Sequence, residues 1–128
     1  MPINKNKKTV LIVEDESFLR DLCSKKLTML EYEVETAIDG KEAIEKINSI
    51  KPSIVLLDLV LPIISGFEVL ERVRTQTDKS ISGIPVIILS NLDGQEDIDR
   101  AIDLGANDYL IKSNFTLDEI IGKMKEYL

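Results

Sequence analysis

The 128-residue sequence contains no histidine and a single cysteine, Cys23. Without histidine the chain has no imidazole metal ligand, no Ser-His or Cys-His nucleophile pair and no phosphohistidine of its own. One cysteine excludes an intrachain disulfide and a thiolate cluster. Cys23 shares the spacing of one helix face with four leucines: Leu19, Leu22, Leu27 and Leu30. We therefore expect this face to be buried and the thiol to be unreactive.

The chain also lacks a basic excess and a long apolar run. Its net charge is -7 and its pI is about 4.6, which argues against sequence-independent binding to nucleic acid or to an anionic membrane. No apolar run approaches the ~20 residues that span a bilayer, and the polar first residues are not a signal peptide, so we expect a cytoplasmic protein. Residues 1–8 are predicted to be a polar lead whose Lys-rich part is solvated, with a basic contact site as the alternative.

The remaining residues, 9–128, are predicted to form one α/β domain. Short apolar segments, typical of buried strands, alternate with amphipathic segments that have helical spacing. Such strict alternation predicts a doubly wound parallel sheet of five strands with five helices on its two faces. The predicted strands are residues 9–13, 33–37, 54–57, 85–89 and 108–111.

Each predicted helix begins at a residue that can accept a hydrogen bond from a backbone amide of the first turn. The candidate caps are Ser17, Asp39 with Glu42, Ser65 with Glu68, Asp93 with Glu96, and Thr116 with Glu119. We expect Ile98, Ala101, Ile102 and Leu104 on the buried side of the fourth helix, with Gly105 just past its end. The polar residues 75–83 are predicted to be a mobile surface connection.

Polar residues follow the predicted strands at the points where these end. Because ligands bind at the carboxyl ends of strands in an open α/β sheet, these side chains are expected to converge on one crevice. The set comprises Glu14, Asp15, Asp58, Ser90 and Lys112.

Three carboxylates in one crevice repel one another unless a cation is present. An all-oxygen ligand set suits a hard divalent ion, Mg²⁺ or Mn²⁺. An ammonium and a hydroxyl beside such an ion can grip phosphoryl oxygens, and phosphoryl transfer needs mainly positioning and charge neutralisation. Asp58 is then the natural nucleophile and would form an acyl phosphate.

Four stretches together make the chain closely resemble the receiver domain of bacterial two-component response regulators, over essentially its whole length. They are residues 10–16, residues 58–62 with Gly66, residues 88–90 and residues 105–112. The resemblance implies a flavodoxin-like fold with sheet order 2-1-3-4-5.

The resemblance also implies a role for each site residue. Asp58 resembles the phosphoacceptor, Asp15 a direct metal ligand and Glu14 a ligand that acts through water. The backbone carbonyl of Val60 would also face the metal, and Lys112 resembles the lysine that pairs with the phosphoryl group.

Ser90 and Tyr109 resemble the switch pair of the family, in which the aromatic ring turns inward when the hydroxyl moves towards the phosphoryl group. By the same resemblance the phosphodonor is a sensor histidine kinase or a phosphotransfer protein. The chain is expected to be no enzyme beyond assisting its own phosphorylation and dephosphorylation. Because it ends with its last helix and no output domain, its effect is expected to pass through a protein partner.

Family members usually pair or bind targets through a face that corresponds here to the fourth helix, the fifth strand and the last helix, around Ile102, Tyr109 and Phe115. A homodimer through this face is therefore an option for this chain.

Two positions depart from the family pattern. Ser113 stands where a proline usually follows the lysine, so the loop is expected to be trans and reshaped, or strained. Asn91 stands where a small residue usually follows the switch hydroxyl. We hypothesise that it crowds the approach to Asp58 and slows the gain or loss of phosphate.

Three other functions are weighed against this one. A receiver-like module that binds its partner without phosphorylation is opposed by the intact acidic, serine and lysine set. A dehalogenase-like phosphatase needs a second aspartate two residues after the nucleophile, where this chain has Val60. A flavodoxin-like cofactor site would need the loop after the first strand to hold phosphate, and residues 14–16 would repel it.

Overall fold

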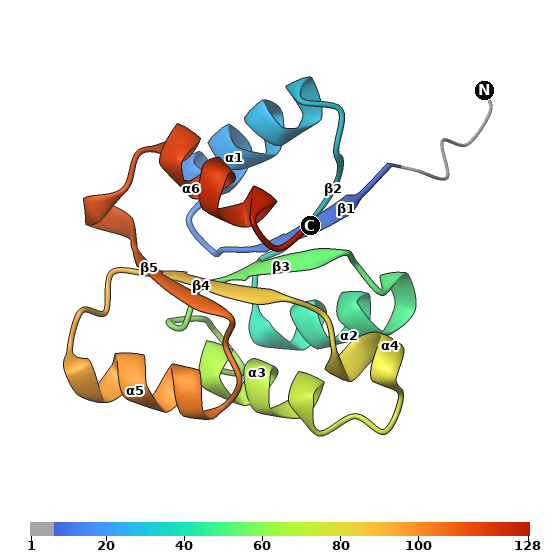
Figure 1. Ribbon diagram of the computed structural model, residues 1–128, viewed down its shortest axis with the longest axis vertical. Coiled ribbons are helices and arrows are strands. Elements are labelled where there is room, and N and C mark those ends of the chain that lie inside the picture. Colours follow the sequence, from blue (N-terminus) through green and yellow to red (C-terminus); the bar gives the residue numbers. More distant parts are fainter. Residues whose placement is uncertain (1–6) are drawn as a thin grey trace.

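The computed structural model describes residues 7–128, which form a five-stranded sheet between two layers of helices (Figure 1). All four strand pairs are parallel and the order is β2-β1-β3-β4-β5, so the expected doubly wound fold and sheet order are confirmed. The strands are β1 Thr9–Val13, β2 Glu33–Ala37, β3 Ile54–Leu57, β4 Val86–Ser90 and β5 Asp108–Ile111.

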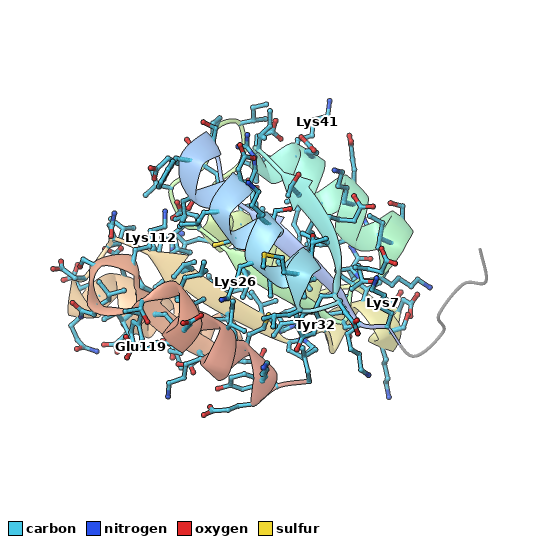
Figure 2. All side chains as sticks on the ribbon, turned by 90° about the horizontal axis from the view of Figure 1, so that it is seen from above. Lys7, Lys26, Tyr32, Lys41, Lys112 and Glu119 are labelled. Atoms are coloured by element: carbon cyan, nitrogen blue, oxygen red, sulfur yellow. The ribbon has the colours of Figure 1, made fainter. Side chains whose placement is uncertain are left out.

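The helices divide between the two faces of the sheet. One face is covered by α1 (Ser17–Met29) and α6 (Leu117–Lys125), and the other by α2 (Gly40–Ile50), α3 (Gly66–Arg74), α4 (Lys79–Ser82) and α5 (Gln95–Asp103) (Figure 1). One turn of 3₁₀ helix, η1 (Lys112–Asn114), follows β5. Figure 2 shows Lys26 of α1 beside α6, where its Nζ lies 3.4 Å from Asp118 Oδ1.

The alternation of side chains along the central strands builds two cores. Leu11 and Val13 belong to the core beneath α2, α3 and α5, whereas Val10 and Ile12 belong to the core beneath α1 and α6. Because helices cover both faces, these strands read as continuous apolar runs. Full burial of each such side chain stabilises the fold by ~1.5–3 kcal/mol. The apolar runs therefore hold the strands in register, and the polar residues that follow them lie at the edge of the sheet.

Three of the predicted helix starts are confirmed by side-chain caps. The Asp39 side chain accepts from the Glu42 amide at 2.8 Å, the Ser65 side chain from the Glu68 amide at 3.3 Å, and the Thr116 side chain from the Glu119 amide at 3.2 Å. The other two candidate caps were wrong: α1 and α5 begin within two residues of Ser17 and Asp93, but they follow Glu16 and Gly94, and neither has a side-chain cap.

The predicted end of α5 at Gly105 is confirmed. Gly105 has φ 105° and its amide donates to Ile102 O at 2.9 Å, while the Ala106 amide donates to Ala101 O at 3.0 Å. This pair of bonds is a Schellman motif, which satisfies carbonyls that the helix end leaves free.

Some burial predictions were wrong. Cys23 is buried as expected, but the exposed fractions of Leu22, Leu30 and Ile102 are 43%, 41% and 47%. The buried stripe of each helix is narrower than the apolar spacing indicated, because the sheet covers only the central positions.

Residues 75–83 are more than a surface connection. They contain α4, a sixth helix among residues 7–128, which begins after Asp78 and buries Ile81 to 6% exposure. The Asp78 side chain accepts a hydrogen bond of 2.9 Å from the Ser80 amide. One apolar residue in a polar segment is thus enough to hold a turn of helix against the core.

The predicted polar lead covers residues 1–8, of which residues 1–6 lie outside the described part of the chain. Lys7 Nζ lies 3.7 Å from Glu33 Oε1 on the edge strand. Within residues 7–128, no helix is both long enough and apolar enough to cross a bilayer.

Candidate functional site

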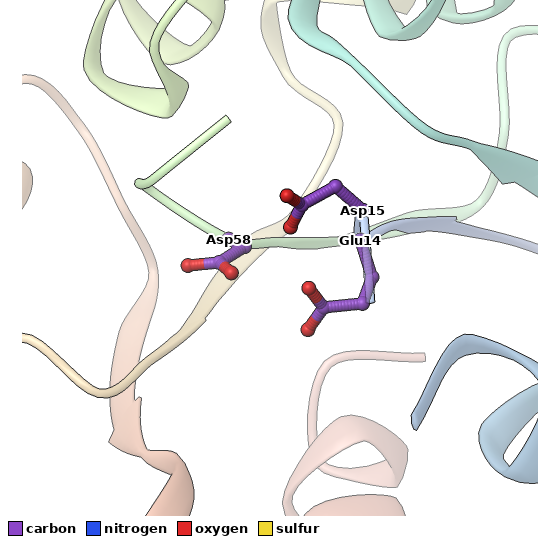
Figure 3. A group of neighbouring side chains, drawn as sticks. All are labelled: Glu14, Asp15 and Asp58. Atoms are coloured by element: carbon purple, nitrogen blue, oxygen red, sulfur yellow. The ribbon is translucent and has the colours of Figure 1, made fainter. Parts of the chain in front are cut away.

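The structure brings the predicted site residues together at the carboxyl edge of the sheet. Glu14 and Asp15 follow β1, and Asp58 follows β3; Figure 3 shows these three side chains as neighbours. One carboxylate oxygen from each lies within 4.8 Å of the other two. Ser90 ends β4 and Lys112 follows β5, so the five residues come from four neighbouring strands.

Asp58 is held in place through both its backbone and its carboxylate. Its amide donates to Val13 O at 3.1 Å, which ties the start of the loop to β1. The residue is only 6% exposed, and Oδ1 accepts a bond of 3.3 Å from the Val60 amide. Behind it, a Cβ on Gly66 would lie 2.2 Å from Asp58 O, so only glycine lets α3 begin this close.

Glu14 is the most buried carboxylate of the site, with 3% exposure. Its Oε2 accepts a bond of 3.3 Å from the Glu16 amide. Its Oε1 forms an ion pair with Lys112, whose Nζ lies 2.5 Å away. Burial raises the pKa of Glu14 and the charge of Asp58 raises it further, against the lowering effect of Lys112.

Lys112 bridges the two buried carboxylates. Its Nζ donates to Asp58 Oδ2 at 2.9 Å in addition to its contact with Glu14. Burial lowers the pKa of Lys112, but the bonds to Glu14 and Asp58 outweigh burial, and the pKa is raised overall. The ammonium is therefore charged, and it partly balances the negative charge of the crevice.

The Lys112–Ser113 bond is trans, since the structure has no cis peptide bond in residues 7–128. Of the two expected alternatives, the trans loop is the one observed, and it continues as the 3₁₀ turn η1.

Ser90 and Tyr109 meet at the same residue of the loop after β4. Ser90 is fully buried, and its Oγ accepts a bond of 3.3 Å from the Leu92 amide. The Tyr109 hydroxyl donates to Leu92 O at 2.6 Å. Burial raises the pKa of Tyr109, as do the negative charges of Asp97 and Asp58, so the hydroxyl keeps the proton that it donates.

The five residues border an open cleft of about 250 Å³. Exposed Asn91 and half-buried Leu92 also line it, together with Val60, whose side chain is 60% exposed. A small phosphorylated group can therefore reach Asp58 past Asn91 and Val60.

The donor set fits a hard divalent cation. Every candidate ligand is an oxygen, and the buried Glu14 Oε1 is paired with Lys112 Nζ, which also serves Asp58. Among residues 7–128, Lys112 is the one cationic residue that lines the cleft, against four acidic ones: Glu14, Asp15, Glu16 and Asp58. A cation bound to the exposed Asp15 and to its buried neighbours would relieve this excess of negative charge.

Sequence reasoning missed Arg20, which supports the acidic pair from α1. Its Nη1 donates to Glu14 O at 3.0 Å and to Asp15 O at 3.3 Å. These bonds fix the backbone turn that aims the two carboxylates. No residue pattern marks Arg20, because both acceptors are main-chain carbonyls.

Comparisons with known proteins agree with this geometry. The family model of the response regulator receiver domain matches residues 10–125. The structure of the chemotaxis response regulator CheY4 of Vibrio cholerae superposes with a TM-score of 0.86 at 28% identity, covering 96% of this chain and 100% of that one. A CheY-like receiver domain protein of Methanospirillum hungatei has a TM-score of 0.86 at 28% identity, covering 94% of this chain and 93% of that one.

Among curated sequences, the "DNA-binding dual master transcriptional regulator RpaA" of Synechocystis is 34% identical over 93% of this chain and 48% of its own length. The chain spans about half the length of the curated relatives it matches. The fold, the acidic edge and these matches make the chain a member of the response regulator receiver domain family, whose members serve in two-component signalling.

Proposed function

We propose that the chain is a phosphorylation-controlled receiver that accepts a phosphoryl group on Asp58 from the phosphohistidine of a sensor kinase or phosphotransfer protein. The observation that carries this proposal is the placement of Asp58. Its carboxylate is buried at the base of an open cleft, oriented by the Val60 amide and paired with Lys112. Such fixed placement is the main requirement of phosphoryl transfer.

The acidic cluster is proposed to hold Mg²⁺, or Mn²⁺ in its place. Asp15 and Asp58 would bind it directly, Glu14 through water, and Val60 through its backbone carbonyl. When bound, the ion supplies positive charge for the oxygens of the phosphoryl group.

The residues of the chain then divide the work. An Asp58 oxygen attacks phosphorus, so that an O–P bond forms while the N–P bond of the phosphohistidine breaks and its electron pair returns to the imidazole. Lys112 Nζ leaves Asp58 Oδ2 and binds one phosphoryl oxygen, and the Ser90 hydroxyl donates a hydrogen bond to another. Ser90 Oγ accepts a hydrogen bond from the Leu92 amide, and the Tyr109 hydroxyl donates to the Leu92 carbonyl. When Ser90 moves towards the phosphoryl group, Leu92 and then Tyr109 are therefore expected to move as well.

The same groups also promote hydrolysis of the acyl phosphate, so the domain assists its own dephosphorylation. Its output passes through protein contacts.

An exposed apolar stripe on α1 supports docking of a protein phosphodonor. Phe18, Leu22 and Met29 are 72%, 43% and 74% exposed at helical spacing, and the stripe begins three residues after Asp15 in the sequence. The face of α5, β5 and α6 is the candidate surface for a homodimer or target, since Ile102 on it is 47% exposed.

Intact-mass spectrometry tests the central claim. We expect the chain, incubated with Mg²⁺ and acetyl phosphate, to gain one phosphoryl group, and we expect no gain without Mg²⁺ or in Asp58→Asn. Beryllofluoride, which mimics the phosphoryl group, guards against rapid hydrolysis. If wild type shows no adduct and binds no beryllofluoride, the constitutive binding module replaces this proposal.

The crowding role of Asn91 has its own test. Since Asn91 lines the cleft, its replacement by alanine should open the approach to Asp58. Asn91→Ala is therefore expected to raise the rate of phosphorylation by acetyl phosphate, or the rate of phosphate loss, by roughly several-fold. Unchanged rates for both steps would show that Asn91 does not limit access.

A further inference from the structure

The connection between β2 and α2 contacts both halves of the acidic site. At its start, the Ala37 carbonyl accepts a bond of 3.0 Å from the Glu14 amide. At its end, the Gly40 amide donates to Pro62 O at 3.3 Å, in the loop that follows Asp58. Residues 37–40 therefore join the backbone of the β1 carboxylates to the backbone of residues 58–65, which we term the Asp58 loop.

Gly40 is required by space rather than by conformation. Its φ is not positive, yet a Cβ at this position would lie 2.0 Å from Ile64 O and 2.8 Å from both Ile64 C and Ile64 Cβ. The nearest atoms belong to the backbone, so no rotamer change can make room. Any side chain here must push the start of α2 and the Asp58 loop apart.

The Asp58 loop is strained where Gly40 contacts it. The Ile64 amide donates to Pro62 O at 2.8 Å around Ile63, whose φ is 71°, so these residues form a γ-turn. A β-branched residue rarely adopts positive φ, and such strain persists only where the surroundings hold it. Pro62 O receives the Gly40 amide as well, so α2 helps to hold the strained turn.

We propose that Gly40 is a positioning residue that sets the spacing between the β1 carboxylates and the Asp58 loop, and thereby the affinity of the site for a divalent cation. The loop carries Val60, whose amide orients Asp58 Oδ1 at 3.3 Å. Displacement of the turn at Ile63 moves Val60 and Asp58 relative to Glu14. The inference rests on the proposed function for its link to phosphoryl transfer.

The test is a Mg²⁺ titration followed by amide NMR shifts, without any phosphodonor. Gly40→Ala is expected to raise the Mg²⁺ dissociation constant on the order of tenfold, as changes to groups that orient metal ligands do. Gly122→Ala is the matched control, because an added Cβ at this exposed position of α6 meets no atom within 4 Å. The control is expected to keep the wild-type dissociation constant.

Pro62→Gly is the second variant. If Gly40→Ala does not fold, Pro62→Gly tests whether the position of the Asp58 loop sets the Mg²⁺ affinity. Pro62 is exposed, so its replacement loosens the turn without adding an atom or emptying the core. We expect the Mg²⁺ dissociation constant to rise by roughly a few-fold, because the looser loop is less preorganised for binding. Lower melting temperatures with wild-type Mg²⁺ affinity in the folded variants would show a purely structural role and overturn the proposal.

Phosphorylation by acetyl phosphate separates this inference from the proposed function. Gly40→Ala is expected to raise the Mg²⁺ concentration for half-maximal rate more than it lowers the maximal rate. Wild type that binds Mg²⁺ yet gains no phosphoryl group would refute the proposed function while the titration still decides the role of Gly40. Wild type that binds no Mg²⁺ would overturn the inference itself.

Discussion

Glu14 is held in surroundings that oppose its charge. Burial, and then the charge of Asp58, raise its pKa above the ordinary value of 4.5, so the folded protein holds the proton more tightly than the unfolded chain does. The stability that this group contributes is therefore complete below pH 4.5 and is lost as pH rises through the raised pKa. At neutral pH and without a divalent metal, ionised Glu14 destabilises the fold.

We predict that Glu14→Gln raises the free energy of unfolding in EDTA at pH 7.5, because it removes the ionised form that burial and the charge of Asp58 disfavour. The gain should shrink towards pH 4.5, the ordinary pKa of this carboxyl, and urea unfolding at several pH values measures it. Glu16→Gln, at an exposed position, is the control. A gain that does not depend on pH would show that ionisation of Glu14 is not its cause.

Ile63 carries the strained backbone of the Asp58 loop at a position where its side chain is 74% exposed. Ile63→Gly should stabilise the protein by about 1 kcal/mol, because the relief of positive-φ strain exceeds the added entropy of an unfolded glycine. Thermal melts measure the effect. Ile63→Ala keeps the Cβ and hence the strain, so an equal gain in that variant would assign the effect to the exposed side chain instead.

Among the elements, α3 is tied to its neighbours by its last residue. Arg74 donates to four acceptors at 2.7–2.9 Å. The acceptors are Ser82 O, Ile84 O, Gly105 O and Asn107 Oδ1. Burial lowers the pKa of Arg74, so the hydrogen bonds must offset its desolvation. One side chain thus joins α3 to the ends of α4 and α5 and to the starts of β4 and β5.

Arg74→Met is expected to destabilise the protein by about 3 kcal/mol, because it leaves several partly buried carbonyls without partners. Arg72→Met removes an exposed arginine of the same helix that pairs with Glu68 at the surface, and should change stability by less than ~0.5 kcal/mol. Urea unfolding of the two variants gives the comparison. Similar losses in both would mean that helix propensity, and not the Arg74 bonds, decides the outcome.

Helix boundaries could be predicted where the cap is local. Thr116 with Glu119, and Asp39 before Glu42, contact amides three residues away, so the sequence carries the whole signal. At α1 and α5 the candidate caps Ser17 and Asp93 do not cap, because these helices follow Glu16 and Gly94. The Glu16 amide donates instead to Glu14 Oε2 in the site, a contact that helix-start patterns do not mark.

For the whole molecule, strand and helix alternation predicted the sheet and the meeting of five polar residues at one edge. This works because parallel strands end at the same edge whatever the loops do. The supports of that edge could not be predicted. Arg20 bonds main-chain carbonyls, and Gly40 is needed by the backbone of Ile64, a contact between two loops that no sequence pattern marks.

We predict that the acidic edge makes the stability of the whole fold depend on divalent cations. Three carboxylates meet in a chain of net charge -7, and the folded state gathers them more closely than the unfolded state does. Any ion that binds only the folded state stabilises it by mass action, by about 2.7 kcal/mol at a hundred times the dissociation constant. We therefore predict that Mg²⁺ raises the urea midpoint of wild type along a saturating curve.

Asp15→Asn should abolish most of that rise, since Asp15 is the exposed carboxylate that an incoming ion reaches first and its replacement leaves the core intact. NaCl at matched ionic strength is the second control, because screening of the net charge stabilises the fold without producing a saturating rise of the urea midpoint. If NaCl reproduces the Mg²⁺ curve, or if Asp15→Asn retains it, then general screening and not a bound ion stabilises the fold. If the Mg²⁺ curve saturates in wild type and is flat in Asp15→Asn, its midpoint gives the affinity of the acidic edge.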